Sequence, residues 1–147
     1  MNKCMLCKSE KCSGCARDLA LLLLRLVLGV VFIYHGWAKI TNIEATLGFF
    51  SSIGLGNVGL VYLAAYGEFI GGVLMILGLW VSYAAVLLSI ISLTALLTVH
   101  ISKGFGIMGG GYEYILTLLV LSISIGLMGA GKYSAMMHKE MSKPDMK

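Results

Sequence analysis

The chain has 147 residues and a formal net charge of +4, with 59% hydrophobic and only 12% charged residues. Soluble globular domains contain about 45–50% apolar and about 25% charged residues, so this composition excludes a soluble domain. The length allows one domain. We expect an integral membrane protein in contact with a lipid bilayer and no nucleic-acid partner.

The chain divides into three predicted parts. Residues 1–18 form a tail that holds all four cysteines, residues 19–131 form an apolar domain, and residues 132–147 form a basic tail. A membrane-spanning helix needs about 20 apolar residues. Four segments approach this length: 19–38, 59–80, 83–101 and 113–129. The first is too long for the hydrophobic region of a signal peptide and lacks a small-residue cleavage site, so we expect it to be retained. The sequence thus predicts an all-α membrane protein, an antiparallel four-helix transmembrane bundle.

The segments between these spans differ in kind. The first connection carries Ile43, Leu47 and Phe50 at helical spacing, which predicts a short helix in the membrane interface. The second, LWVSY, is short enough to require a tight hairpin, with its aromatic residues in the interfacial belt. The third, SKGFGIMGGGY, is glycine-rich. A phosphate-binding loop is one interpretation, but no strand precedes it and no Gly-Lys-Ser/Thr follows, so a flexible or re-entrant loop is favoured.

The distribution of basic residues predicts the orientation. Each tail carries four lysines or arginines, whereas the two connections on the opposite side offer only Lys39 and Lys103. We therefore expect a multi-pass protein of the cell membrane. The positive-inside rule predicts that both its N and C termini lie in the cytoplasm. The cysteines would lie in a reducing compartment.

Six ionisable residues fall within or at the ends of the predicted spans. Arg25 lies in the inner half, and Glu68 lies about 13 Å from the outer end of its helix. The other four lie towards the outer side: His35, Lys39, His100 and Glu113. Charged groups inside a membrane usually face the protein interior and find partners.

Two interpretations of these residues stay open. One is a structural ion pair that fixes helix register, with Glu68 bonded to Arg25, His35 or His100, and with Lys39 and Glu113 as ordinary interfacial residues. The other is a polar pocket that binds a quinone headgroup, an anion or a proton. Gly67-x-x-x-Gly71, beside Glu68, indicates a helix-packing face.

Several stretches resemble the DoxX family of small four-helix membrane proteins: RLVLGVVFIYHGWAKI, YGEFIGGVLMILGL and HISKGFGIMGGGYEYILTLLVLSISIGLMGAGKYSA. The resemblance covers about residues 20–135. Family positions fall on Arg25, His35, Gly36, Lys39, Glu68, Gly71, His100, Gly104, Phe105 and Glu113. The closing family pattern Gly-Pro-Gly-x-x-Ser-x-Asp appears as GAGKYSA, without its proline and aspartate. The resemblance implies a role near quinone-linked sulfur oxidation or oxidative-stress complexes.

The amino-terminal tail has the spacing Cys4-x2-Cys7-x4-Cys12-x2-Cys15. Two such pairs can supply a tetrahedral set of four sulfurs for zinc or, less well, an iron–sulfur cluster. The insert between the pairs is shorter than in usual zinc sites. The alternatives are a redox dithiol, best at Cys12 and Cys15, or no defined role. Nearby lysines favour thiolates in both of the first two cases.

We expect the protein to be a subunit of a membrane redox assembly that exchanges electrons with a quinone-like lipid through a soluble or membrane partner. Glu68, Arg25, His35 and His100 would line the pocket, with Glu68 or a histidine carrying the proton. The sequence leaves open whether the chain itself is an oxidoreductase. The alternatives are a non-catalytic scaffold that recruits a soluble partner through the cysteines, or a small-solute transporter acting as a homodimer.

Overall fold

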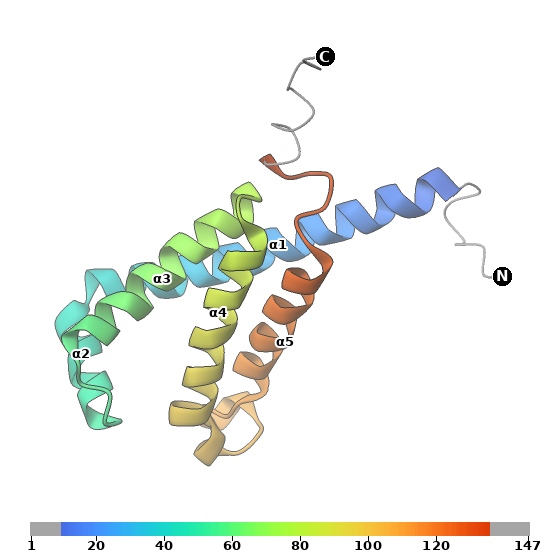
Figure 1. Cartoon of the computed structure of the whole chain (residues 1–147). Coiled ribbons are helices and arrows are strands. Elements are labelled where there is room, and N and C mark those ends of the chain that lie inside the picture. Colours follow the sequence, from blue (N-terminus) through green and yellow to red (C-terminus); the bar gives the residue numbers. More distant parts are fainter. Residues whose placement is uncertain (1–9, 136–147) are drawn as a thin grey trace.

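The computed structural model describes residues 10–135, with side chains from residue 14 onward (Figure 1). Five α-helices follow one another: α1 (Glu10–Thr41), α2 (Ile43–Ser52), α3 (Val58–Leu77), α4 (Val81–Ala95) and α5 (Glu113–Met128). The chain leaves α4 through a π-helical turn (Leu96–His100) and a 3-10 turn (Ile101–Lys103), and a second 3-10 turn covers Ile107–Gly109. The described residues contain no strand.

The predicted all-α membrane fold is confirmed. Three helical segments are long and apolar enough to cross a membrane: Gly14–Thr41, Val58–Leu77 and Val81–Lys103. The fourth apolar helix, α5, is shorter, with 16 residues. Helix α1 begins at Glu10 and ends at Thr41, so it extends beyond the predicted span at both ends. It therefore includes Cys12 and Cys15, which the sequence placed in the tail.

The four long helices form two side-by-side pairs, α1 with α3 and α4 with α5, and α4 also packs against α3 (Figure 1). The α1–α3 pair is close because glycines line it. A Cβ atom on Gly72 would lie 2.7 Å from the carbonyl oxygen of Gly29, and one on Gly36 would lie 2.8 Å from that of Ala65. Small residues at helix contacts are the usual means of close association in lipid, where apolar surfaces gain little from meeting one another.

Glycines also set the α3–α4 contact. A Cβ on Gly67 would meet the side chain of Ile91, and one on Gly71 would meet that of Leu88. This confirms that the Gly67-x-x-x-Gly71 motif is a packing face. Residues from all four long helices form one apolar core: Leu28, Phe32, Met75, Val81, Ala84, Ala85, Leu88, Leu118 and Ile125.

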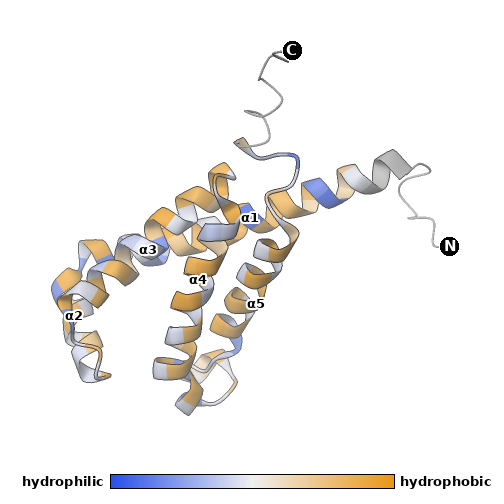
Figure 2. Cartoon of the chain, in the orientation of Figure 1, coloured by the Kyte–Doolittle hydropathy of each residue, from blue (hydrophilic) through white to orange (hydrophobic). Residues whose placement is uncertain are grey.

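The outward faces of these helices are apolar as well (Figure 2). Leu23, Val86 and Val120 are each more than half exposed. A soluble protein rarely exposes contiguous apolar surface of this extent. These faces are suited to contact with lipid, as the composition predicted.

The connections follow local sequence signals. The short helix predicted in the first connection is present as α2, and it has no buried residue. The Asn57 side chain caps α3 by accepting a hydrogen bond from the Gly59 amide. The tight hairpin after α3 is also present: Gly78 ends the helix with a φ of 70°, and Trp80 starts α4 with a φ of 44°. Left-handed backbone is common for glycine and unusual for tryptophan.

Candidate functional site

An ion pair joins the carboxyl-terminal end of α1 to the middle of α3. Lys39 Nζ donates a hydrogen bond to Glu68 Oε2 over 2.5 Å. Glu68 is only 6% exposed, so its carboxyl group is buried in the protein interior. A pair with this burial matters, because a buried charge that loses its partner costs several kcal/mol, about 3–5 in proteins.

Side-chain direction explains why these two residues meet. Gly36 packs against Ala65, so in an antiparallel pair the backbone of Lys39 lies roughly 9 Å from the level of Glu68. Every Cα–Cβ bond in a helix tilts towards the helix amino terminus. Because α1 and α3 run in opposite directions, the Lys39 side chain tilts along the helix axis towards the level of Glu68, and the Glu68 side chain tilts towards the level of Lys39. The two side chains therefore span the distance between their backbones.

The same rule corrects the expected contact between Arg25 and Glu68. Arg25 also tilts towards the amino terminus of α1, which is away from Glu68. Its Nη1 donates to the Ala130 carbonyl, and its Nη2 donates to the Tyr133 carbonyl over 2.6 Å. Arg25 thus lies at the opposite end of the bundle and does not pair with Glu68.

Two aromatic contacts involve residues that neighbour the ion pair in the sequence. His35, one turn before Lys39 on α1, is partly buried, and its ring centroid lies 6.3 Å from that of Tyr114 on α5. Trp37 packs on Phe69 of α3 with centroids 6.0 Å apart. We call His35, Lys39, Glu68 and Tyr114 the polar layer. It draws on three helices and combines a cation, an anion and two polar rings.

The two remaining predicted residues lie around the glycine-rich loop. His100 Nδ1 is 2.7 Å from the Gly110 carbonyl, which closes the loop across its base. Glu113 begins α5, and its backbone N–H donates to the Phe105 carbonyl. The structure therefore brings Lys39 to Glu68 with His35 beside them, and it gives His100 and Glu113 contacts within the loop region.

The segment after α5, residues 129–135, folds back along α1, and we call it the carboxyl-terminal strap. Besides the two bonds from Arg25, the Lys132 amide donates to Asp18 Oδ1 over 3.2 Å. The Tyr133 hydroxyl lies 3.7 Å from the exposed Cys15 thiol, and this hydrogen bond raises the pKa of the Tyr133 phenol. The strap corresponds to the GAGKYSA sequence, and the buried Arg25 donates two of the hydrogen bonds that hold it against α1.

The four-cysteine metal site stays a prediction. Cys4 and Cys7 lie outside the described residues, while Cys12 and Cys15 lie three positions apart at the amino-terminal end of α1. This spacing on one helix is compatible with both the metal and the dithiol interpretations.

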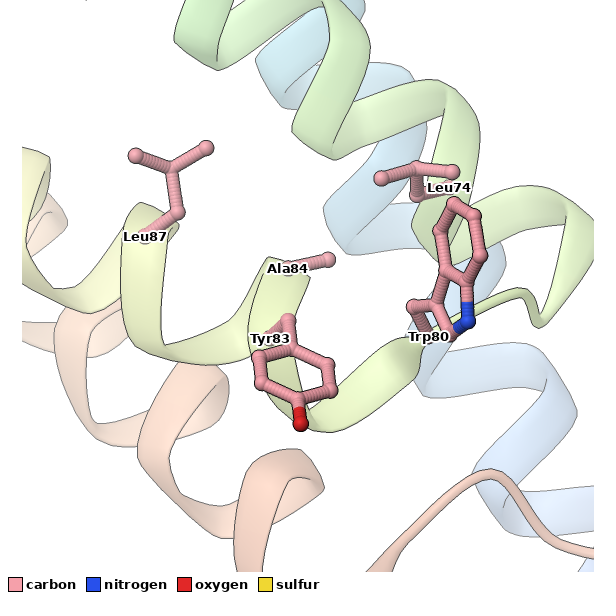
Figure 3. Close-up of a pocket in the computed structure, with 5 residues that line it drawn as sticks. All are labelled: Leu74, Trp80, Tyr83, Ala84 and Leu87. Atoms are coloured by element: carbon pink, nitrogen blue, oxygen red, sulfur yellow. The ribbon is translucent and has the colours of Figure 1, made fainter.

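Two surface clefts lie elsewhere along α4. One, of about 190 Å³, lies at the α3–α4 hairpin and is lined by Leu74, Trp80, Tyr83, Ala84 and Leu87 (Figure 3). The other, of about 300 Å³, runs between α4 and α5 and includes Ser82, Ser89 and Gly126. Neither contains a residue of the polar layer. Their apolar walls offer no acid–base chemistry.

The sequence placed Lys39 among the six candidate pocket residues, with an interfacial role as the alternative, and it gave no indication of Tyr114. The spacing of His35 and Lys39 by one helical turn placed both on one face of α1, which was the available signal for a shared site. Tyr114 follows Glu113 directly at the start of α5. A polar aromatic residue there gave no signal beyond that of an interfacial residue.

Comparisons with known proteins agree with this architecture. The family model described as DoxX matches residues 20–101. A Bacillus subtilis (strain 168) protein named "Putative oxidoreductase CatD" is 36% identical over 113 residues, which cover 77% of this chain and 81% of that protein. No solved structure matches significantly. The extent of these matches, together with the four apolar helices, shows that the chain belongs to the DoxX family.

Proposed function

We propose that the chain is the membrane-embedded subunit of a redox assembly, and that the polar layer binds the headgroup of a quinone-like lipid. The observation that carries this proposal is the Lys39–Glu68 ion pair, in which the Glu68 carboxylate is buried and the Lys39 side chain is 25% exposed. The relative named as an oxidoreductase supports a redox role. Ionisable pairs at membrane depth are generally found at substrate, ion or proton pathways.

The groups in the polar layer fit such a headgroup. A quinone oxygen accepts hydrogen bonds, and a quinol hydroxyl donates them. The Lys39 ammonium is a donor, and the Glu68 carboxylate is an acceptor. The rings of His35 and Tyr114 offer apolar faces beside these groups. The layer therefore supplies complementary partners for both redox states.

Reduction of a bound quinone to a quinol would consume two electrons and two protons. We assign both to a pair of thiols on a partner protein, which would lose two electrons and two protons as they form a disulfide. Lys39 would orient a headgroup oxygen, and Glu68 would pass the two protons to the headgroup one after the other. We assign the resupply of each proton to Glu68 to His35, which lies one turn before Lys39 on α1.

The excess of lysine and arginine in the two tails supports a cytoplasmic location for both. In that orientation the polar layer would lie towards the other face of the membrane. The cysteine tail then lies most of a bilayer away from the polar layer, and it would serve as a docking or sensing module rather than as the redox centre.

The expected result in membranes is quinol formation that depends on the polar layer. Membranes containing the protein and its native partners should reduce decylubiquinone with dithiothreitol as the thiol donor. Glu68→Gln, which keeps the side-chain shape and removes the proton carrier, should lower the rate at least tenfold. The absorbance change of quinone reduction measures this rate.

Glu44→Gln is the matched control, because Glu44 is an exposed residue of α2. It should leave the rate unchanged. If Glu68→Gln retains the full rate in folded protein, the Lys39–Glu68 pair is structural and the scaffold interpretation stands.

A further inference from the structure

Two serines are completely buried in the bundle, but only one of them has its hydroxyl group satisfied. Ser122 Oγ on α5 donates to the Leu118 carbonyl over 2.8 Å, within its own helix. Ser92 Oγ on α4 has no hydrogen-bond partner among the described residues, although the residue is 0% exposed. A buried hydroxyl without a partner costs about 1–3 kcal/mol. Such a group inside a packed core points to a ligand-binding function.

The packing of α3 on α4 places Ser92 near the level of Glu68. Gly67 faces Ile91, and Gly71 faces Leu88. In this antiparallel register the level of Glu68 falls at about residue 90 or 91 of α4. Ser92 therefore lies within about one helical turn of Glu68 along the bundle.

Both residues also face the centre of the bundle. Glu68 is buried and lies two helical turns before Met75, which belongs to the apolar core shared by all four long helices. Ser92 continues the buried stripe of α4 that contains Val81, Ala85 and Leu88. Their Cα–Cβ bonds tilt towards the amino termini of antiparallel helices, so the two side chains incline towards one another.

We propose that Ser92 belongs to the quinone site, where its hydroxyl bonds an oxygen of the headgroup held by Lys39 and Glu68. This inference rests on the proposed function and extends the site to α4. A hydroxyl can donate to a quinone carbonyl and can accept from a quinol hydroxyl, so one residue serves both redox states. It would also select for ligands with an oxygen at this position, because other ligands would leave the hydroxyl unpaired.

The test is quinone binding by variants of the two buried serines. Purified protein in lipid nanodiscs would be titrated calorimetrically with decylubiquinone, and thermal unfolding would be measured without quinone. Ser92→Ala should weaken binding about five- to tenfold. Because the substitution removes an unpaired buried hydroxyl, it should leave the unfolding temperature equal to that of the wild type or raise it.

Ser122→Ala is the matched control, since it removes an equally buried hydroxyl from the neighbouring helix. It should leave the quinone affinity unchanged. Wild-type affinity in Ser92→Ala would overturn the role of Ser92 and leave the proposed function standing. A wild-type protein that binds no decylubiquinone would overturn both.

Discussion

Replacing Lys39 with methionine should lower the free energy of unfolding by about 3–5 kcal/mol, because it leaves the Glu68 carboxylate buried without its cation. Methionine keeps most of the length of the lysine stem, so loss of packing contributes little. The measurement is a denaturant titration of the reconstituted protein, followed by the fluorescence of its tryptophans.

The double variant Lys39→Met, Glu68→Gln should recover most of that loss, since it removes both charges together. Lys103→Met provides the matched control. Lys103 is an exposed lysine at the same end of the bundle, and its removal should change the free energy of unfolding by less than about 0.5 kcal/mol. Equal stability of Lys39→Met and the wild type would mean that the pair contributes nothing to the folded state.

Replacing Arg25 with methionine should free the carboxyl-terminal strap from α1. The guanidinium donates to two carbonyls of the strap, those of Ala130 and Tyr133. Hydrogen bonds to a charged group contribute about 1.5–3 kcal/mol each, so the combined loss should be at least about 3 kcal/mol. Hydrogen–deuterium exchange of the amides in residues 129–135 should rise strongly, while the middle of α4 stays protected.

Arg25→Lys should rescue only part of this protection. An ammonium group keeps the charge but lacks the planar fork that reaches two carbonyls at once. Arg17→Met removes an exposed arginine from the same helix and should leave the exchange pattern unaltered. Wild-type exchange of the strap in Arg25→Met would show that other contacts hold it.

The features that were predictable from the sequence depend on local patterns. Apolar length located the spans, helical spacing located α2, and Gly67-x-x-x-Gly71 marked a packing face. Each of these signals is contained in a short window of residues. Their agreement with the structure reflects the strong requirement that lipid places on continuous apolar helices.

The contacts that the sequence did not predict depend on the direction in which side chains tilt and on how the end of the chain folds back against α1. Lys39 reaches Glu68, and Arg25 does not, because side chains tilt towards helix amino termini and the two helices are antiparallel. The partners of Arg25 are backbone carbonyls more than 100 positions away, and backbone carbonyls carry no sequence signal. The free hydroxyl of Ser92 likewise becomes visible only when its surroundings are known.

The most direct test of the quinone site is the location of a bound quinone. The chain has two tryptophans. Trp37 lies near the polar layer, whereas Trp80 lines the cleft at the opposite end (Figure 3). Trp80→Phe and Trp37→Phe each leave one reporter whose fluorescence a nearby quinone quenches. Decylubiquinone would be titrated into each variant in nanodiscs, with and without Glu68→Gln.

We expect saturable quenching of Trp37 in the Trp80→Phe protein, and loss of that saturation when Glu68→Gln is added. Saturable quenching of Trp80 alone, or quenching of Trp37 that Glu68→Gln does not alter, would contradict a quinone site at the polar layer.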